Sequence, residues 1–326
     1  MAAKWAEKLT DLRERETLFL GGGGFKTLSY LGVLEVLGWQ RFRSVCGVSA
    51  GAIIALHLAL GHSPFEIMGS FLEHEQLLVG SLSLGRLWAG HAPVRPEMVR
   101  QAIESILLRK GFKPDATMQD LAQRRPVGFS AVAFCLDTCK LVRFSADSHP
   151  GFRVAEVATA CIAIPMLFSS VPLGEAGLRY YDAGLVNSAP LGFFPAKETL
   201  ALVVRSLPVE VPTGLPETVQ FRCLFMRTMA HENAANEGMA VMQVPYPTPG
   251  VGLLTRSNTP LSVFCETGAL YTALYVIQGE LVGVLAVLLS CLSFCGTSPP
   301  TGLFLSSRPT SPILSATLPS TPSCGA

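Results

Sequence analysis

The stretch FLGGGGFKTLSYLGVLEVL, residues 19–37, places four consecutive glycines between an apolar segment and a helical repeat. Leucine recurs at every third residue from 28 to 37, and this spacing predicts a helix over residues 26–37 that ends at Gly38. Residues 17–20, before the glycines, predict a short strand. Because glycine raises the entropic cost of folding, four in succession indicate that this backbone approaches another group closely. The candidates are a phosphate, an oxyanion and a neighbouring strand.

A second unit of the same design follows in SVCGVSAGAIIALHLAL, residues 44–60. Residues 44–46 predict a strand, GVSAG predicts a sharp turn, and residues 52–60 predict an apolar helix. Strands that alternate with helices in this way predict an α/β fold with a mainly parallel central sheet. The other predicted elements are helices over residues 64–79, 95–110, 153–161 and 262–279, and strands over residues 127–136, 140–144 and 200–204 and ending at residue 182.

The composition argues against some classes of protein. The chain has 326 residues, a formal net charge of +1 and 49% hydrophobic residues. Charged residues make up only 15%, against roughly 25% in ordinary soluble domains. A balanced, sparse charge argues against a nucleic-acid partner. The excess of apolar residues belongs in a core, on a lipid-facing surface or in a membrane segment.

Cysteine usage and the N-terminus indicate the compartment. The nine cysteines form no CxxC pair and no His/Cys spacing typical of a metal site. We therefore expect buried free thiols in a reducing compartment, with neither a metal nor a cofactor. The opening MAAKWAEKLTDLRERE is charged and lacks the apolar segment of a secretory signal, so we expect a cytoplasmic protein.

The chain divides by composition into five parts. We expect an N-terminal helix over residues 1–16, a catalytic domain over residues 17–205 and a partly helical extension over residues 206–280. Residues 281–295 form a charge-free apolar run, and the Pro/Ser/Thr-rich residues 296–326 predict a disordered tail. The apolar run is shorter than the about 20 residues of a spanning helix, so a membrane anchor and a buried or interfacial segment both stay open.

The GVSAG turn carries a candidate nucleophile. It fits the pattern G-x-S-x-G, in which a serine on a tight strand-to-helix turn exposes its Oγ. Gly47 and Gly51 supply the small flanking residues, and the N-terminal amides of the following helix favour negative charge near Ser49. The alternative is an ordinary tight turn, but the predicted strand before it and helix after it favour the nucleophile.

A nucleophilic serine needs a base, and two arrangements compete. Ser49, Asp182 and His231 occur in the order of an α/β-hydrolase triad. Too few residues precede Ser49 for the strands of that fold, however, and no strand precedes His231. A Ser49–Asp182 dyad is therefore favoured over the triad, although Asp182 also suits an ordinary turn. The amides of Gly22, Gly23 and Gly24 then predict an oxyanion hole, and His57 and His62 are interpreted as packing or capping residues.

Several motifs in order resemble the patatin-like phospholipase family. GGGGFK resembles its G-G-G-x-[KR]-G loop, GVSAG matches its nucleophile turn, and YYDAGLVNSAP resembles its D-G-[GA] motif followed by Asn and Pro. ATACIAIPMLFSSV, residues 158–171, and FCLDTCKLVRFS, residues 134–145, are similar to the segments between them. The resemblance covers about residues 17–205.

The resemblance implies a three-layer α/β/α sandwich and metal-free hydrolysis of lipid acyl esters, as in a phospholipase A, lysophospholipase or lipase. It implies Ser49 as nucleophile and Asp182 as base, with a lipid substrate and peripheral membrane contact. Other residues at motif positions are Gly22, Gly23 and Gly24 as oxyanion donors, Lys26 at the basic position, and Gly47, Gly51 and Gly184.

Two residues depart from the family pattern. Thr27 replaces the last glycine of the loop, and Ala183 replaces the glycine after the aspartate. If position 183 requires a positive φ, alanine is strained there. An inactive lipid-binding or interaction protein on the same fold is therefore the alternative function. A nucleotide-binding loop is not supported, because Phe25 takes the place of the glycine before its lysine.

Overall fold

The protein is built on an eight-stranded sheet. The computed structural model describes residues 10–80, 92–165, 167–204, 239–244, 266–270 and 272. Across the sheet the strands run in the order β5 (Val171–Leu173), β6 (Leu178–Asp182), β3 (Gly128–Cys135), β2 (Ser44–Val48), β1 (Thr17–Leu20), β7 (Thr199–Val204) and β8 (Ala240–Val244), and β4 (Lys140–Ser145) pairs with β3 off this path.

The centre of the sheet is parallel, as the sequence predicts. Thr17 of β1 pairs with Ser44 of β2 on one side and Thr199 of β7 on the other, both in parallel register. The β2–β3 and β7–β8 pairs are also parallel, whereas β4 and β6 run antiparallel to β3, and β5 runs antiparallel to β6. The predicted α/β class with a mainly parallel sheet is confirmed.

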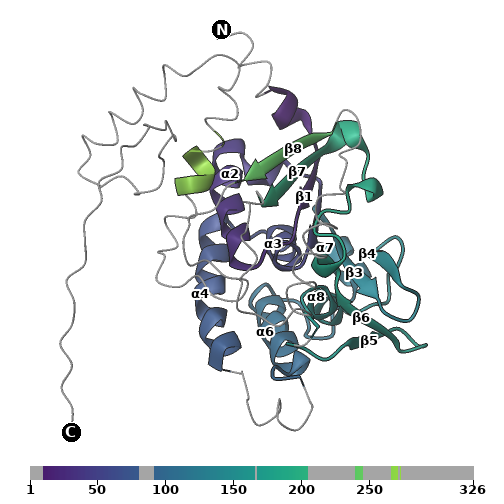
Figure 1. The fold of residues 1–326 in the computed structure, drawn as a ribbon. Coiled ribbons are helices and arrows are strands. Elements are labelled where there is room, and N and C mark those ends of the chain that lie inside the picture. Colours follow the sequence, from purple (N-terminus) through teal and green to yellow (C-terminus); the bar gives the residue numbers. More distant parts are fainter. Residues whose placement is uncertain are drawn as a thin grey trace, which may run out of the picture. The chain divides into compact units, whose positions relative to one another are not determined.

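Helices cover one face of the sheet (Figure 1). Helices α3 (Ala50–Ala59) and α8 (Val154–Cys161) lie directly on the strands, α4 (Pro64–Gly80) packs on α2 (Ser29–Leu37) and α3, and α6 (Pro96–Arg109) packs on α8. The short helix α7 (Met118–Arg124) begins with a capping box between Thr117 and Asp120. The 3₁₀ helices are η1 (Gly24–Leu28), η2 (Trp39–Arg41), η3 (Ala183–Leu185), η4 (Leu191–Phe193) and η5 (Ala196–Glu198).

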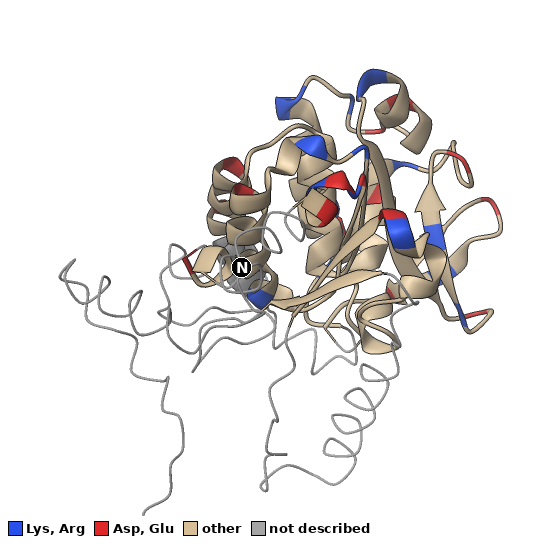
Figure 2. Ribbon diagram, turned by 90° about the horizontal axis from the view of Figure 1, so that it is seen from above, with Lys and Arg blue, Asp and Glu red and all other residues tan. Residues whose placement is uncertain are grey.

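The central strands β1, β2, β3 and β7 are largely buried on both faces, which explains their continuous apolar runs. In β1, Leu18 and Leu20 join the large core under the helices, whereas Phe19 joins a second cluster on the other face. Leu191 and Phe194 cover that second cluster, so the segment around η4 closes this face of the sheet. Charged residues lie mainly on the helices and loops around the sheet (Figure 2).

Most predicted elements are present, with differences at the glycine loop and near the C-terminus. The predicted helix 26–37 divides into η1 and α2, because Gly24, with a φ of 57°, starts a 3₁₀ turn that the Thr27 hydroxyl closes by donating to the Gly24 carbonyl at 2.8 Å. Strands β5 and β8 and helix α7 were not predicted. The sheet continues through β8 into the segment 206–280, and of the predicted helix 262–279 the structure describes residues 266–270 and 272, all helical.

Other predictions are met in part or fall outside the described residues. Cys46, Cys135 and Cys161 are buried free thiols as predicted, but Cys139 is exposed, so that prediction is wrong for Cys139. Of the N-terminal helix, residues 10–14 are described and helical. His231, the apolar run 281–295 and the tail 296–326 lie outside the described residues. Within the described ranges, every helix is too short or too polar to cross a membrane.

Helix α3 meets β1 and β2 at backbone distance. A β-carbon on Gly51 would overlap the carbonyl oxygen of Leu20, and one on Gly47 would overlap the carbonyl oxygen of Gly51. Only glycine allows this approach, which places the first turn of α3 directly beside the end of β1. The turn between β2 and α3 is thereby held against the glycine loop that follows β1.

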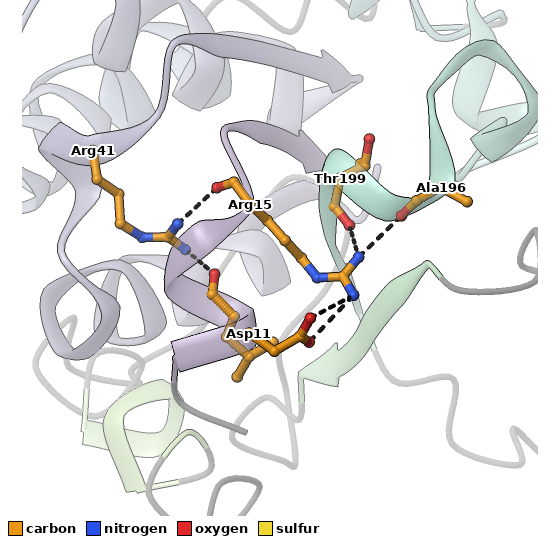
Figure 3. Close-up of polar contacts among 6 residues, drawn as sticks. Asp11, Arg15, Arg41, Ala196 and Thr199 are labelled. Carbon is orange, nitrogen blue, oxygen red and sulfur yellow. Dashed lines mark hydrogen bonds and ion pairs between the residues drawn. The ribbon is translucent and has the colours of Figure 1, made fainter. Parts of the chain in front are cut away.

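The N-terminal segment is attached to the sheet by two arginines (Figure 3). Arg15 is only 8% exposed, and its Nη1 donates to the carbonyls of Ala196 at 2.9 Å and Thr199 at 3.1 Å. Arg41 donates to the carbonyls of Leu12 at 2.6 Å, of Arg13 at 2.8 Å and of Arg15 at 2.7 Å. Arg41 thus satisfies carbonyls at the end of the helical residues 10–14 that have no partner within a helix.

We expect Gly51→Ala to lower the free energy of unfolding by about 2 kcal/mol or more, because the added methyl group displaces α3 from β1. Gly69→Ala is the matched control, since Gly69 is exposed in α4 and a β-carbon there meets no atom within 4 Å. It is expected to raise stability by about 1 kcal/mol. Urea unfolding followed by circular dichroism measures both changes, and equal stabilities of the two variants would contradict the proposed contact.

We expect Arg15→Met to lower the free energy of unfolding by about 2 kcal/mol, because hydrogen bonds from a charged donor to the buried carbonyl of Thr199 and the partly buried carbonyl of Ala196 are lost. Arg13→Met removes the same charge from an exposed side chain two residues away, and is expected to change stability by less than about 0.5 kcal/mol. Thermal or urea unfolding of the two variants provides the comparison. An equal loss in both would show that charge, and not the buried contacts, is responsible.

Candidate active site

Ser49 lies on the turn between β2 and α3. Its φ of 54° and ψ of −133° put a non-glycine residue in a region that costs about 1–3 kcal/mol. The Ala52 amide donates to the Ser49 carbonyl at 2.8 Å, so helix α3 begins immediately after this residue. This strained turn is the geometry that the G-x-S-x-G pattern predicts, and it directs the N-terminal amides of α3 toward the serine.

Asp182 lies at the end of β6 and faces the serine. The Ser49 hydroxyl donates to Oδ2 of Asp182 at 2.6 Å, and the Gly184 amide donates to Oδ1 at 2.7 Å. Asp182 is 3% exposed and Ser49 6% exposed, so both lie beneath the surface. A β-carbon on Gly184 would lie 3.0 Å from Asp182 Oδ1 and 3.5 Å from Ser49 Cβ. Glycine at 184 therefore leaves room for the pair.

Burial changes the acidity of this carboxyl group. Desolvation raises the pKa of Asp182 from 3.8 to about 6, while the hydrogen bonds from Ser49 and Gly184 act in the opposite direction. At neutral pH the group is a carboxylate that is more basic than an ordinary aspartate. A pKa near the operating pH is the property required of a general base.

The glycine loop passes beside the serine. A β-carbon on Gly22 would lie 3.1 Å from Ser49 Cβ. The Gly21 amide donates to Leu202 at 2.8 Å, and the Gly22 amide donates to the Ser188 carbonyl at 2.9 Å. Within the described part of the chain, the amides of Gly23 and Gly24 donate no hydrogen bond, so these two loop amides are open to another acceptor.

Ser49 and Gly24 both line a cavity of about 400 Å³. This volume falls within the 300–1,000 Å³ range of small-ligand sites. Helices α3, α4 and α6 and the segment after α8 form its wall. The apolar part of this wall includes Phe25, Ile53, Phe71, Ile103, Ile164 and Phe168. The serine therefore faces a space suited to a hydrocarbon chain.

The remaining predicted positions differ in their relation to the site. Lys26 is half-buried in η1, and Thr27 fits the loop through its bond to Gly24. Ala183 is fully buried in η3, and among the described non-glycine residues only Ser49 and Cys139 have a positive φ. Alanine at 183 therefore carries none of the backbone strain that a positive φ would impose.

Some residues of the site were not identified from sequence. Ser188 accepts the Gly22 amide through its main chain, and α6 contributes Val99, Ile103 and other wall residues of the cavity. The apolar periodicity of residues 95–110 predicts that helix but not which surface it covers. His57, interpreted as a packing residue, also lines the cavity. Across the described ranges, no three His, Cys, Asp or Glu side chains are arranged as metal ligands.

Comparison with known proteins gives the same family as the motifs. The family described as "Patatin-like phospholipase" matches residues 18–194. "Probable lipid hydrolase 463L" of Invertebrate iridescent virus 6 is 25% identical over 183 residues, which cover 54% of this chain and 62% of the relative. A "cGAMP-activated phospholipase" of Pseudomonas aeruginosa is 30% identical over 203 residues, which cover 58% of each protein. The chain thus spans less than two thirds of the length of these curated relatives.

A solved structure supports the fold. VipD from Legionella pneumophila aligns with a TM-score of 0.50 at 18% sequence identity, over 81% of this chain and 67% of VipD. At this identity the likeness concerns the fold alone. Because the family match spans more than half of the sequence and the sheet, turn and motifs agree with it, the chain belongs to the patatin-like phospholipase family.

Proposed function

We propose that this chain hydrolyses acyl esters of lipids, with Ser49 as nucleophile and Asp182 as general base. The observation that carries the proposal is the 2.6 Å hydrogen bond from Ser49 Oγ to a buried carboxylate, at the wall of an apolar cavity. The bond points the serine proton at the base, and the cavity supplies space for the acyl chain. Family membership supports a lipid hydrolase in general terms.

In the first half-reaction, Asp182 accepts the proton of Ser49 as Oγ attacks the ester carbonyl carbon. The carbonyl π electrons move to oxygen and form a tetrahedral oxyanion. We assign its stabilisation to the amides of Gly23 and Gly24, because the Gly22 amide already donates to Ser188. The N-terminus of α3 adds a favourable field. The protonated Asp182 then gives its proton to the departing alcohol, and an acyl-serine ester remains.

In the second half-reaction, Asp182 removes a proton from water, which attacks the acyl carbon of the acyl-serine. The same amides stabilise the second oxyanion. Collapse of this intermediate breaks the bond to Ser49 Oγ, which takes the proton back from Asp182, and a fatty acid leaves. The predicted dyad therefore acts in both halves with no further titratable group.

The substrate belongs to the class of lipid acyl esters, of which phospholipids, lysophospholipids and acylglycerols are the members to be compared. Peripheral membrane contact and a cytoplasmic location are part of this proposal. Phe65 at the start of α4 is 77% exposed and Leu108 near the end of α6 is 54% exposed. These two apolar side chains lie at adjoining helix ends, since Lys110 pairs with Glu66 at 3.5 Å, and a lipid surface would cover them.

The alternative of an inactive lipid-binding protein loses its main support. It rested on strain at Ala183, and the backbone there has no positive φ. The triad of Ser49, Asp182 and His231 is supported only by the order of these residues in the sequence, because His231 lies outside the described ranges.

Ser49→Ala is expected to abolish both labelling by a fluorophosphonate probe and hydrolysis of lipid esters, because it removes the nucleophile. Asp182→Asn is expected to lower kcat at least about 10²-fold by removing the general base. Ser148→Ala, at an exposed serine, is the matched control and should retain activity. His231→Ala should also remain active. Labelling that persists in Ser49→Ala would refute the proposed nucleophile.

The pH dependence tests the base. Because the pKa of Asp182 is raised to about 6, kcat/KM should increase about tenfold per pH unit below that value and level off above it. A soluble ester measured from about pH 5 to about pH 8 gives this profile. A rate independent of pH through about 6 would argue against the buried carboxylate as base.

A further inference from the structure

The chain that follows β6 links the proposed base to the glycine loop. It begins with Asp182, the last residue of that strand, and its Ser188 carbonyl accepts the Gly22 amide at 2.9 Å. Between these two points the Asn187 amide donates to the Ala183 carbonyl at 2.8 Å and closes a turn. One short segment therefore carries the base and also contacts the loop to which the oxyanion donors are assigned.

The side chain of Asn187 fixes the orientation of one peptide group in this segment. Its Oδ1 accepts the Ala189 amide at 2.8 Å. The Ala189 N–H and the Ser188 carbonyl belong to the same planar peptide unit, and a trans peptide bond points them in opposite directions. Asn187 holds one side of this unit, and the Gly22 amide binds the other. The direction of the Ser188 carbonyl is therefore set by the side chain at position 187.

The contact at Gly22 is important because consecutive glycines do not hold a loop in one conformation by themselves. On one side of it, the Gly21 amide donates to a carbonyl of β7 at 2.8 Å. On the other side, the Thr27 hydroxyl donates to the Gly24 carbonyl at 2.8 Å. Gly22 lies between these anchors and directly before the open amides of Gly23 and Gly24. Without the Ser188 carbonyl, the backbone before those amides would be free to rotate.

We infer that Asn187 is a positioning residue, whose side chain holds the two open amides of the glycine loop where the tetrahedral oxyanion forms. Among the described residues, Ser49 and Gly24 line the cavity and Asn187 does not, so its effect passes through the backbone. The inference rests on the proposed function, because the oxyanion arises only if Ser49 attacks an ester. Displacing groups that act on the reacting atoms by about 1 Å can cost about 10²-fold in rate.

Substitution of Asn187 tests whether its effect is confined to the transition state. Asn187→Leu keeps the size of the side chain and removes the acceptor. We expect kcat to fall at least about tenfold while KM changes less than about twofold, because binding of the ester in the cavity is untouched. Asn187→Ser should recover part of the loss, since a serine hydroxyl accepts the amide two residues on. If Asn187→Leu does not fold, Asn187→Ala removes the same acceptor with a smaller change.

Thr117→Val is the matched control. It removes another side-chain acceptor of a backbone amide, the N-cap of α7, and Thr117 does not line the cavity. The control should be less stable but should keep kcat. An unchanged kcat in Asn187→Leu, or an equal loss of kcat in Thr117→Val, would overturn the inference.

Two ketones separate the oxyanion from ordinary binding. Ser49 Oγ adds to the carbonyl carbon of undecyl trifluoromethyl ketone, its proton passes to Asp182, and the carbonyl π electrons form an oxyanion. Undecyl methyl ketone has the same chain, but its less electrophilic carbonyl is not attacked. Inhibition constants for Asn187→Leu should rise about tenfold or more for the first ketone and less than about twofold for the second. An equal change for both ketones would contradict the positioning role.

Amide hydrogen exchange tests the contact with the loop without any need for turnover. NMR spectra of protein labelled with isotopic glycine follow the Gly22 amide. Its exchange with solvent should be at least about tenfold faster in Asn187→Leu than in the unmodified protein or in Thr117→Val, because its hydrogen bond opens more often. Exchange at the same rate in all three proteins would refute the link between Asn187 and the glycine loop.

The outcomes separate this inference from the proposed function. If the unmodified protein hydrolyses lipid esters and Asn187→Leu does so equally well, the positioning role is refuted and the hydrolase stands. If the unmodified protein neither hydrolyses esters nor binds the trifluoromethyl ketone, the proposed function fails, and the oxyanion part of the inference fails with it. Faster exchange of the Gly22 amide in Asn187→Leu would then still support the contact between this side chain and the loop.

Discussion

The hydrogen bond between Ser49 and Asp182 joins two segments that lie 133 residues apart in the chain. Strand β3 brings them together, because it lies between β2 and β6. Val48, which precedes the serine, pairs with Val132 of β3, and Asp182 pairs with Ala133, the next residue along. The pair therefore depends on the register of three strands and on the glycines that let α3 start beside β1. Strand register and the glycine contacts are both features of backbone packing, and the contact between the two side chains depends on them.

The buried carboxylate has an energetic cost. The pKa of Asp182 rises from 3.8 to about 6 on folding, so between those values the folded protein binds more protons than the unfolded chain. The favourable contribution of the protonated group is complete below pH 3.8 and is lost as the pH rises through about 6. At neutral pH the protein thus retains a charged group in a site that disfavours charge. The same desolvation makes the carboxylate basic enough to accept the serine proton.

Local sequence patterns predict those strands, turns and helices whose formation depends on residues close together in the chain. The order of elements in the two strand–glycine–helix units is predicted correctly because their strands are apolar, their turns need glycine, and a leucine repeat or a continuous apolar run marks each helix. The first of these helices nevertheless divides into η1 and α2. Strand β8 is not predicted because its five residues lie between prolines at 208, 212 and 216 and prolines at 245, 247 and 249, and only its pairing with β7 distinguishes it. The cavity wall also escaped, since the periodicity of α6 does not tell which neighbour it faces. The occupied Gly22 amide depends on Ser188, a contact between distant segments that no motif encodes.

Because β6 pairs antiparallel with β3, a residue deleted within β6 would disturb the contact between Ser49 and Asp182. A change of length in the turn before β6 would not. Side chains along a strand alternate between the two faces of the sheet. Deleting one residue within β6 would turn the carboxyl group to the opposite face and separate it from the serine. Gly174 and Gly177, in the tight turn before β6, both have positive φ, and a longer loop there would leave the pairing of Asp182 with Ala133 intact. Insertions and deletions should therefore accumulate at this hairpin tip and be absent a few residues further on.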